Sequence, residues 1–150
     1  MENDKKILMI VDSNALIHRA YHALPGLTAP DGTLVNAVYG FCLIFFKAIT
    51  EIKPDYIVAS FDVKGKTFRH DEFEDYKATR EKKADNFYHQ IPIIKDVLKS
   101  MDVLVLEKQG FEADDVIGTV AEMTKDENLE TVVVTGDLDT LQLLREDLKV

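Results

Sequence analysis

The chain has 150 residues, of which 46% are hydrophobic and 30% are charged, and its formal net charge is −9. This length supports a single globular domain with a hydrophobic core, and the single cysteine excludes a framework of intrachain disulfides. The charged N-terminus and the short apolar run after it exclude a secretory signal, and no apolar stretch could span a membrane, so we expect a cytoplasmic protein.

Short apolar runs alternate with helical patterns along the chain. Strands are predicted over residues 7–11, 56–61, 103–106 and 129–135, and another begins at residue 148. Helices are predicted over residues 14–24, 35–52, 91–101 and 112–125, with a short helix over 138–144. Short β-branched runs that are each followed by a helix are typical of an α/β fold built on a buried, mostly parallel sheet.

Several of these strands end on an aspartate. Asp12 follows the first strand, Asp62 follows the second, and Asp137 and Asp139 follow the fourth. Because ligands bind outside the carboxyl ends of the strands in open α/β sheets, we expect these carboxylates to share one crevice. The helix predicted to begin at residue 112 opens with three more acids beside that crevice: Glu112, Asp114 and Asp115.

These seven acids predict a metal site. A helix N-terminus favours acidic side chains through capping and the helix dipole, so a single acid there is ordinary. Seven carboxylates in one crevice would repel one another and would be costly to keep ionised without a cation. Oxygen ligands suit Mg²⁺ or Mn²⁺, whereas the lone cysteine and the four histidines have no zinc-like spacing.

Residues 63–86 form a segment with little apolar periodicity that follows Asp62. Aromatic residues are interleaved there with a basic cluster: Lys64, Lys66, Arg69, Lys77, Arg80, Lys82 and Lys83. Basic and aromatic side chains together suit phosphate contact and base stacking, although acids dilute the cluster and a solvated mixed-charge loop is the alternative interpretation. The position of the segment at the functional edge of the sheet favours a working loop that binds nucleic acid, despite the negative net charge.

Five ordered blocks of the sequence carry a family resemblance: 36–41, 61–70, 76–80, 110–118 and 134–139. With these blocks the chain resembles the 5′-nuclease domain found at the start of bacterial DNA polymerase I, within the flap endonuclease family and its PIN-like fold. The resemblance covers essentially the whole chain. It implies a Rossmann-like sheet flanked by helices, with the basic segment of residues 63–86 as a helical arch over the site.

The resemblance also implies roles for individual residues. The seven acids named above match the family's metal-binding positions, and Lys77 and Arg80 match functional cationic positions of the arch. His18 stands where the family commonly has a stacking tyrosine, and we expect it to face nucleic acid together with Arg19 and the basic cluster. Ser13 replaces a common glycine, and Leu138 replaces a common lysine.

The function implied is a metal-dependent 5′-3′ exonuclease or flap endonuclease that hydrolyses phosphodiester bonds near DNA 5′ ends, as in DNA replication and repair. Two Mg²⁺ or Mn²⁺ ions would serve the reaction, and the partner would be DNA with a 5′ flap or 5′ end. We expect residues 1–150 to be the N-terminal part of a monomeric catalytic domain whose helix-three-turn-helix half lies beyond this chain. Whether a polymerase domain follows is left open.

Two other functions fit parts of the sequence. Asp137 and Asp139 after an apolar strand come close to the nucleophile motif of haloacid-dehalogenase-type phosphatases, but the threonine at position 140 is one residue early. Such a phosphatase would need Asp137 as its nucleophile and would not need Asp62 or Glu112. The other alternative is a catalytically incomplete DNA-binding fragment, which would bind DNA in a salt-dependent manner without cutting it.

Overall fold

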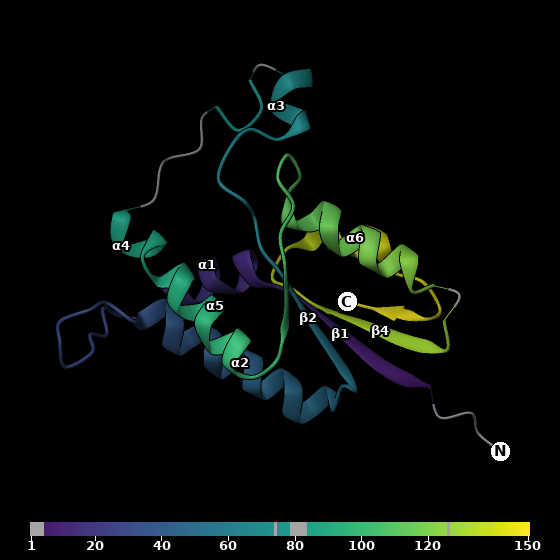
Figure 1. The fold of residues 1–150 in the computed structure, drawn as a ribbon, viewed down its shortest axis with the longest axis horizontal. Helices are drawn as coiled ribbons and strands as arrows, with labels where there is room; N and C mark the ends of the chain where they lie inside the picture. Colours follow the sequence, from purple (N-terminus) through teal and green to yellow (C-terminus); the bar gives the residue numbers. More distant parts are fainter. Residues whose placement is uncertain (1–4, 74, 79–83, 126) are drawn as a thin grey trace.

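A computed structural model describes residues 5–73, 75–78, 84–125 and 127–150 (Figure 1). Its described residues form a five-stranded sheet in the order β3-β2-β1-β4-β5. All pairings between these named strands are parallel, which confirms the α/β prediction. The strands are β1 (Lys6–Asp12), β2 (Tyr56–Ser60), β3 (Leu104–Leu106), β4 (Leu129–Val134) and β5 (Leu148–Lys149).

The strand order places a topological switch at the centre of the sheet. From β1 the chain adds β2 and β3 on one side, and it later adds β4 and β5 on the other. The register pairs Asp12 with Ser60 and Val11 with Val134, so the carboxyl ends of the three central strands lie level with one another. A crevice at such a switch point is the usual ligand site of an open α/β sheet.

Helices cover both faces of the sheet (Figure 1). The helices α1 (Ser13–Ala23), α2 (Asn36–Ile52) and α5 (Gln90–Ser100) lie on one face, and α6 (Ala113–Met123) lies on the other. Side chains alternate along β1, so Met9 and Val11 join the core beneath the first group while Leu8 and Ile10 join the core beneath α6. A 3₁₀ helix, η1 (Leu138–Leu143), links β4 to β5. None of the helices among the described residues is long and apolar enough to cross a membrane.

Residues 36–41, one of the five stretches that carry the family resemblance, serve mainly to pack α1 against α2. A Cβ atom added at Gly40 would lie 2.7 Å from the Cβ atom of Ala20, so the two helices approach more closely than a larger residue allows. The fully buried Gln90 accepts a hydrogen bond from the backbone N–H of Ala37 (2.8 Å) and donates one to Oδ1 of Asn36 (3.0 Å). These bonds tie α5 to the first turn of α2, and they satisfy polar groups that would otherwise be buried without partners.

The segment of residues 63–86, for which the family resemblance implied a helical arch, contains regular structure that its own residue pattern did not predict. Two short helices lie there, α3 (Phe68–Glu72) and α4 (Asp85–Tyr88). Neither is long enough to show a helical period or to be stable alone, so contacts with distant parts of the chain hold them. The backbone N–H of Phe68 donates to the carbonyl of Gly110 (3.0 Å), and the buried ring of Phe87 packs 5.1 Å from Tyr21.

Candidate metal and nucleic-acid site

Asp12 and Asp137 are joined through a threonine that the sequence analysis did not single out. Asp12 is 3% exposed and caps α1, with Oδ1 accepting from the N–H of Ala15 (3.2 Å). Its Oδ2 accepts from the hydroxyl of Thr135 (2.7 Å), and that hydroxyl oxygen accepts from the N–H of Asp137 (2.9 Å). Asp137 Oδ1 in turn accepts from the N–H of Asp139 (2.9 Å). These bonds hold the ends of β1 and β4 together.

Asp62 is positioned by α1 and α6. Its backbone N–H donates to Oδ1 of Asn14 (2.9 Å), and its Oδ1 accepts from the N–H of Ala113 (2.7 Å), the first residue of α6. An N–H group at a helix start is a favourable partner for a carboxylate, because the helix dipole adds to the hydrogen bond. The role of Asn14 was not predicted from the sequence. The one feature that could have indicated it is its position as a polar residue two places after the aspartate that ends β1.

The carboxylates at this edge lie close enough to affect one another's ionisation. Burial, followed by the negative charges of Asp12, Asp137, Asp62 and Glu112, raises the pKa of Asp114 to about 6. The pKa of Asp12 is also raised, chiefly by burial and further by Asp62 and Asp137, although its hydrogen bonds act in the opposite direction. The predicted convergence of acids from β1, β2, β4 and α6 is therefore present in the fold.

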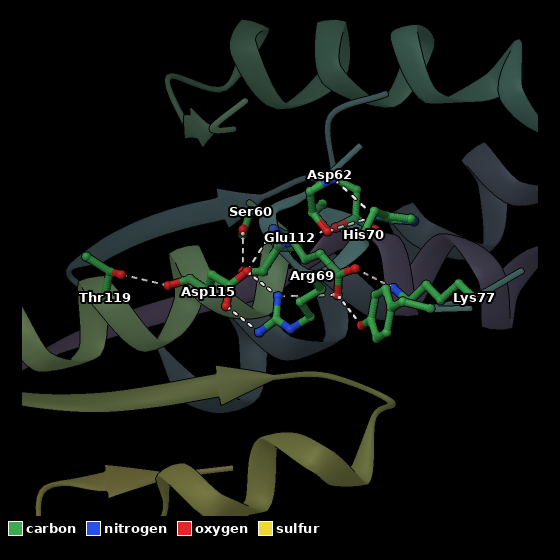
Figure 2. Close-up of polar contacts among 11 residues, drawn as sticks. Ser60, Asp62, Arg69, His70, Lys77, Glu112, Asp115 and Thr119 are labelled. Atoms are coloured by element: carbon green, nitrogen blue, oxygen red, sulfur yellow. Dashed lines mark hydrogen bonds and ion pairs between the residues drawn. The ribbon is translucent and has the colours of Figure 1, made fainter. Parts of the chain in front are cut away.

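Cations of the basic segment pair with two of the acids at the start of α6. Figure 2 shows Arg69 facing Asp115 and Lys77 facing Glu112. The two terminal nitrogens of Arg69 each donate to one carboxylate oxygen of Asp115, both at 2.7 Å. Lys77 Nζ donates to Oε1 of Glu112 (2.7 Å), and the hydroxyl of Tyr76 donates to Oε2 (3.2 Å). The basic segment therefore lies against the acidic edge.

A cleft of about 570 Å³ lies at this junction. It is bordered by residues of the basic segment, of α6 and of η1: Arg69, Tyr76, Glu112, Asp114, Asp115, Leu138, Asp139 and Gln142. Leu138, which stands where a lysine was expected from the resemblance, is 78% exposed there. The cleft brings Asp139 onto the same surface as the α6 acids.

The donor chemistry of the edge fits a hard cation, because the converging side chains offer only carboxylate oxygens. Within residues 5–73, 75–78, 84–125 and 127–150, no three acidic, histidine or cysteine side chains are arranged so that they could hold a metal ion together. Glu112 is instead paired with Lys77, and Asp115 with Arg69. A metal ion bound by Glu112 would compete with Lys77 for the negative charge of this carboxylate.

The remaining residues predicted to contact nucleic acid are spread around the edge. His18 and Arg19 are exposed on α1, where the Cδ atom of Arg19 lies beside Gly136 in the loop that carries Asp137. Lys66 is exposed, and Lys64 places its ammonium over the ring of Tyr88, 5.5 Å from the centroid. Arg80, Lys82 and Lys83 lie outside the described residues. The predicted contacts that reach the acids in the described part of the chain are Arg69 and Lys77.

Comparisons with known sequences agree on one family. Residues 7–150 match the family model of the 5′-3′ exonuclease, N-terminal resolvase-like domain. The chain is 41% identical over 143 residues to DNA polymerase I of Caldicellulosiruptor bescii, which covers 95% of this chain and 17% of that protein. It is 39% identical over 140 residues to DNA polymerase I of Bacillus subtilis, covering 93% of this chain and 16% of that protein. The chain thus spans about a sixth of the length of these relatives.

Solved structures share the fold at low sequence identity. A T5 protein co-crystallised with metal ions has a TM-score of 0.77 at 16% identity, over 96% of this chain and 54% of that chain. A T5 flap endonuclease in a complex with DNA and metal ions has a TM-score of 0.74, with the same identity and coverage. These two likenesses establish the PIN-like architecture.

Proposed function

Because the chain belongs to the family of the 5′-3′ exonuclease N-terminal resolvase-like domain, we propose that it carries the metal-dependent active site of a 5′-3′ exonuclease or flap endonuclease. The reaction is hydrolysis of phosphodiester bonds near the 5′ end or 5′ flap of DNA. The observation that supports this most is the convergence of carboxylates from three strand ends and the start of α6, beneath cations of the basic segment.

Six of the seven acids at this edge are proposed to bind the metal ions directly. Burial raises the pKa of Asp114 most, and the negative charges of Asp12, Asp137 and Asp62 raise it further. Together with Glu112 and Asp139 they are the residues we propose to hold two Mg²⁺ or Mn²⁺ ions. When bound, the ions would polarise the phosphodiester and make the attacking water more acidic.

The protein's own cations would bind and orient the DNA. Lys77, once released from Glu112, can donate to a non-bridging phosphate oxygen and offset the negative charge that develops in the transition state. Arg80 is proposed for the same role from the family resemblance. His18 and Arg19 extend the exposed cationic and aromatic surface beyond the loop that carries Asp137, which suits contact with the DNA backbone and bases.

The proposed partner is DNA, in keeping with the T5 flap endonuclease of the same fold that was crystallised with DNA and metal ions. A longer protein that includes a polymerase is suggested by the DNA polymerase I relatives, of which this chain matches 16–17%. The match of residues 7–150 to an exonuclease family supports a nuclease over the phosphatase alternative.

Cleavage of a 5′-labelled flap substrate in Mg²⁺, compared between the wild-type chain and Asp62→Asn, tests the proposal. We expect Asp62→Asn to lose at least about a hundredfold in rate, because it removes a carboxylate proposed to bind metal without removing hydrogen-bonding capacity. Circular dichroism should show an unchanged fold. Normal cleavage by this variant, or hydrolysis of a small phosphomonoester that needs Asp137 alone, would contradict the assignment. A wild-type chain that binds DNA but never cuts it in Mg²⁺ or Mn²⁺ would favour the DNA-binding alternative.

A further inference from the structure

Asp115 is the acid of the described cleft whose two carboxylate oxygens both accept hydrogen bonds from the same arginine, Arg69. Oδ1 accepts from Arg69 Nη2 (2.7 Å), and Oδ2 accepts from Arg69 Nη1 (2.7 Å) and from the backbone N–H of Glu112 (2.9 Å). The two side chains are only 29% and 20% exposed. A bidentate pair between an arginine and a carboxylate is among the strongest charge-assisted contacts in proteins. Using Asp115 elsewhere would remove this contact and leave Arg69 with only its longer ion pair to Glu112 (3.9 Å).

Arg69 belongs to a short helix that is attached to the same loop by other contacts. The N–H of Phe68 donates to the carbonyl of Gly110 (3.0 Å), and the rings of Phe68 and Phe111 lie 5.6 Å apart. The guanidinium of Arg69 also lies over the ring of Phe68, 4.6 Å from its centroid. The loop before α6 and the first turn of α6 therefore form the platform on which α3 rests.

Hydrogen-bonded turns connect this anchored helix to Lys77. The N–H of Phe73 donates to the carbonyl of Arg69 (2.9 Å), and the N–H of Tyr76 donates to the carbonyl of Phe73 (3.0 Å). Lys77 itself has a φ of +57°, a left-handed conformation that is unfavourable for a residue with a side chain. Such a conformation persists where surrounding contacts hold it, and here it accompanies the bond to Glu112.

We propose that Asp115 and Arg69 are a positioning pair, in which Asp115 holds Arg69 and the anchored α3 places Lys77 at Glu112. This inference rests on the proposed nuclease function. In this proposal Asp115 acts through Arg69 and is not a direct metal ligand. Arg69 stabilises the base of the arch and does not contact the DNA backbone.

Hydrogen exchange of residues 68–73 and 75–78 in the chelated, metal-free 150-residue chain is the first test. We expect Asp115→Asn and Arg69→Lys each to raise exchange there by about tenfold, because each removes the bidentate contact. Arg69→Lys keeps the charge and the size, so it still reports if Asp115→Asn fails to fold. Asp147→Asn is the control, since it breaks another arginine–aspartate contact, the single hydrogen bond from Arg145 Nε (2.8 Å) beside β5, and should leave this exchange unchanged.

Manganese affinity, measured by titration of the same variants, separates a positioning role from metal ligation. We expect Asp115→Asn to retain Mn²⁺ affinity within about threefold, while Asp62→Asn loses about tenfold or more, because it removes an anionic oxygen proposed to contact the ion directly. A charge swap, Arg69→Asp with Asp115→Arg, should restore protection of residues 68–73 relative to either single change, because coupled residues depart from additivity.

The proposal is overturned if Asp115→Asn lowers Mn²⁺ affinity as much as Asp62→Asn while leaving exchange of the arch unchanged. It is also overturned if the charge swap is as unprotected as the single variants. A wild-type chain that neither binds Mn²⁺ nor cuts DNA would contradict the proposed function. The exchange measurements, made without metal, would still decide whether the pair positions the arch.

Discussion

The ammonium nitrogen of Lys77 lies 2.7 Å from Oε1 of Glu112, although 35 residues separate them in the chain. Their side chains are 29% and 13% exposed, so the pair is partly shielded from water. The same lysine is the proposed phosphate contact, and the same glutamate is a proposed metal ligand. In the absence of metal and DNA, each group therefore serves as the partner of the other.

Replacing Lys77 with methionine should change metal affinity and catalysis in opposite directions. Without the competing ammonium, we expect Mn²⁺ to bind about two- to fivefold more tightly, the size typical of a partly exposed ion pair. Cleavage of flap DNA should fall at the same time, because the phosphate loses its cation. Lys95→Met, which removes the ion-pair partner of Glu107 outside the cleft, should change neither quantity. Weaker Mn²⁺ binding by Lys77→Met would show that Lys77 does not compete with the ion.

Asp114 predicts a pH dependence of stability in the chelated protein. Its pKa in the folded chain is raised to about 6, chiefly by burial and then by neighbouring carboxylates, above its ordinary value of 3.8. The folded state therefore binds this proton more tightly than the unfolded state, and ionisation of Asp114 costs stability increasingly as pH rises from 4 to above 6.

We therefore expect Asp114→Asn to raise the melting temperature in EDTA at pH 7.5 by roughly 2–4 °C. Because the Asp114 side chain is only partly buried, the gain in the free energy of unfolding is limited to about 1 kcal/mol. The gain should fall towards zero as pH is lowered to 4, where Asp114 is protonated in both states. Thermal unfolding at a series of pH values measures this difference. A variant that is less stable than the wild type at pH 7.5 would contradict the expected repulsion.

Gly40→Ala should destabilise the packing of α1 against α2. The added Cβ would meet Ala20 Cβ at 2.7 Å and the side chain of Leu24 at 2.9 Å, so the helices would have to separate. We expect a loss of about 1–3 kcal/mol in the free energy of unfolding, measured by urea denaturation. Gly118→Ala in α6 is the matched control, because its nearest neighbour would be Leu143 at 3.8 Å and helix propensity should make it neutral or stabilising. Equal effects of the two changes would exclude the steric explanation.

Ser13 and Ser60 form a second matched pair. Both are fully buried, but Oγ of Ser60 donates to the carbonyl of Ala113 (3.1 Å), whereas Oγ of Ser13 has no hydrogen-bond partner among the described residues. We expect Ser60→Ala to cost about 1–2 kcal/mol in the free energy of unfolding and Ser13→Ala to be neutral or stabilising. Urea denaturation of both variants measures the contrast. A substantial loss for Ser13→Ala would mean that its hydroxyl has a partner, such as an ordered water.

The sheet and its acidic edge could be predicted because local patterns encode them. Runs of apolar residues that end at Asp12, Asp62 and Asp137 identify strands, and the rules for parallel sheets place their carboxyl ends at one edge. The helix boundaries shifted by only one or two residues, as is usual at frayed ends. The division into an N-terminal part and a further half beyond the chain, and the roles of Arg80, Lys82 and Lys83, stay predictions.

Which acid meets which cation was decided only by the tertiary structure. Arg69 and Asp115 are 46 residues apart, and Thr135 reaches Asp12 across 123 residues. Residue type and local periodicity do not predict such pairings, because the pairings depend on how separate elements are brought together in the fold. For the same reason the local residue pattern did not predict α3, since its helix is stabilised by the loop at Gly110 and not by its own five residues. The sequence by itself determined the chemistry gathered at the edge of the sheet, and the fold decided how that chemistry is shared between metal ligands and the contacts that position the arch.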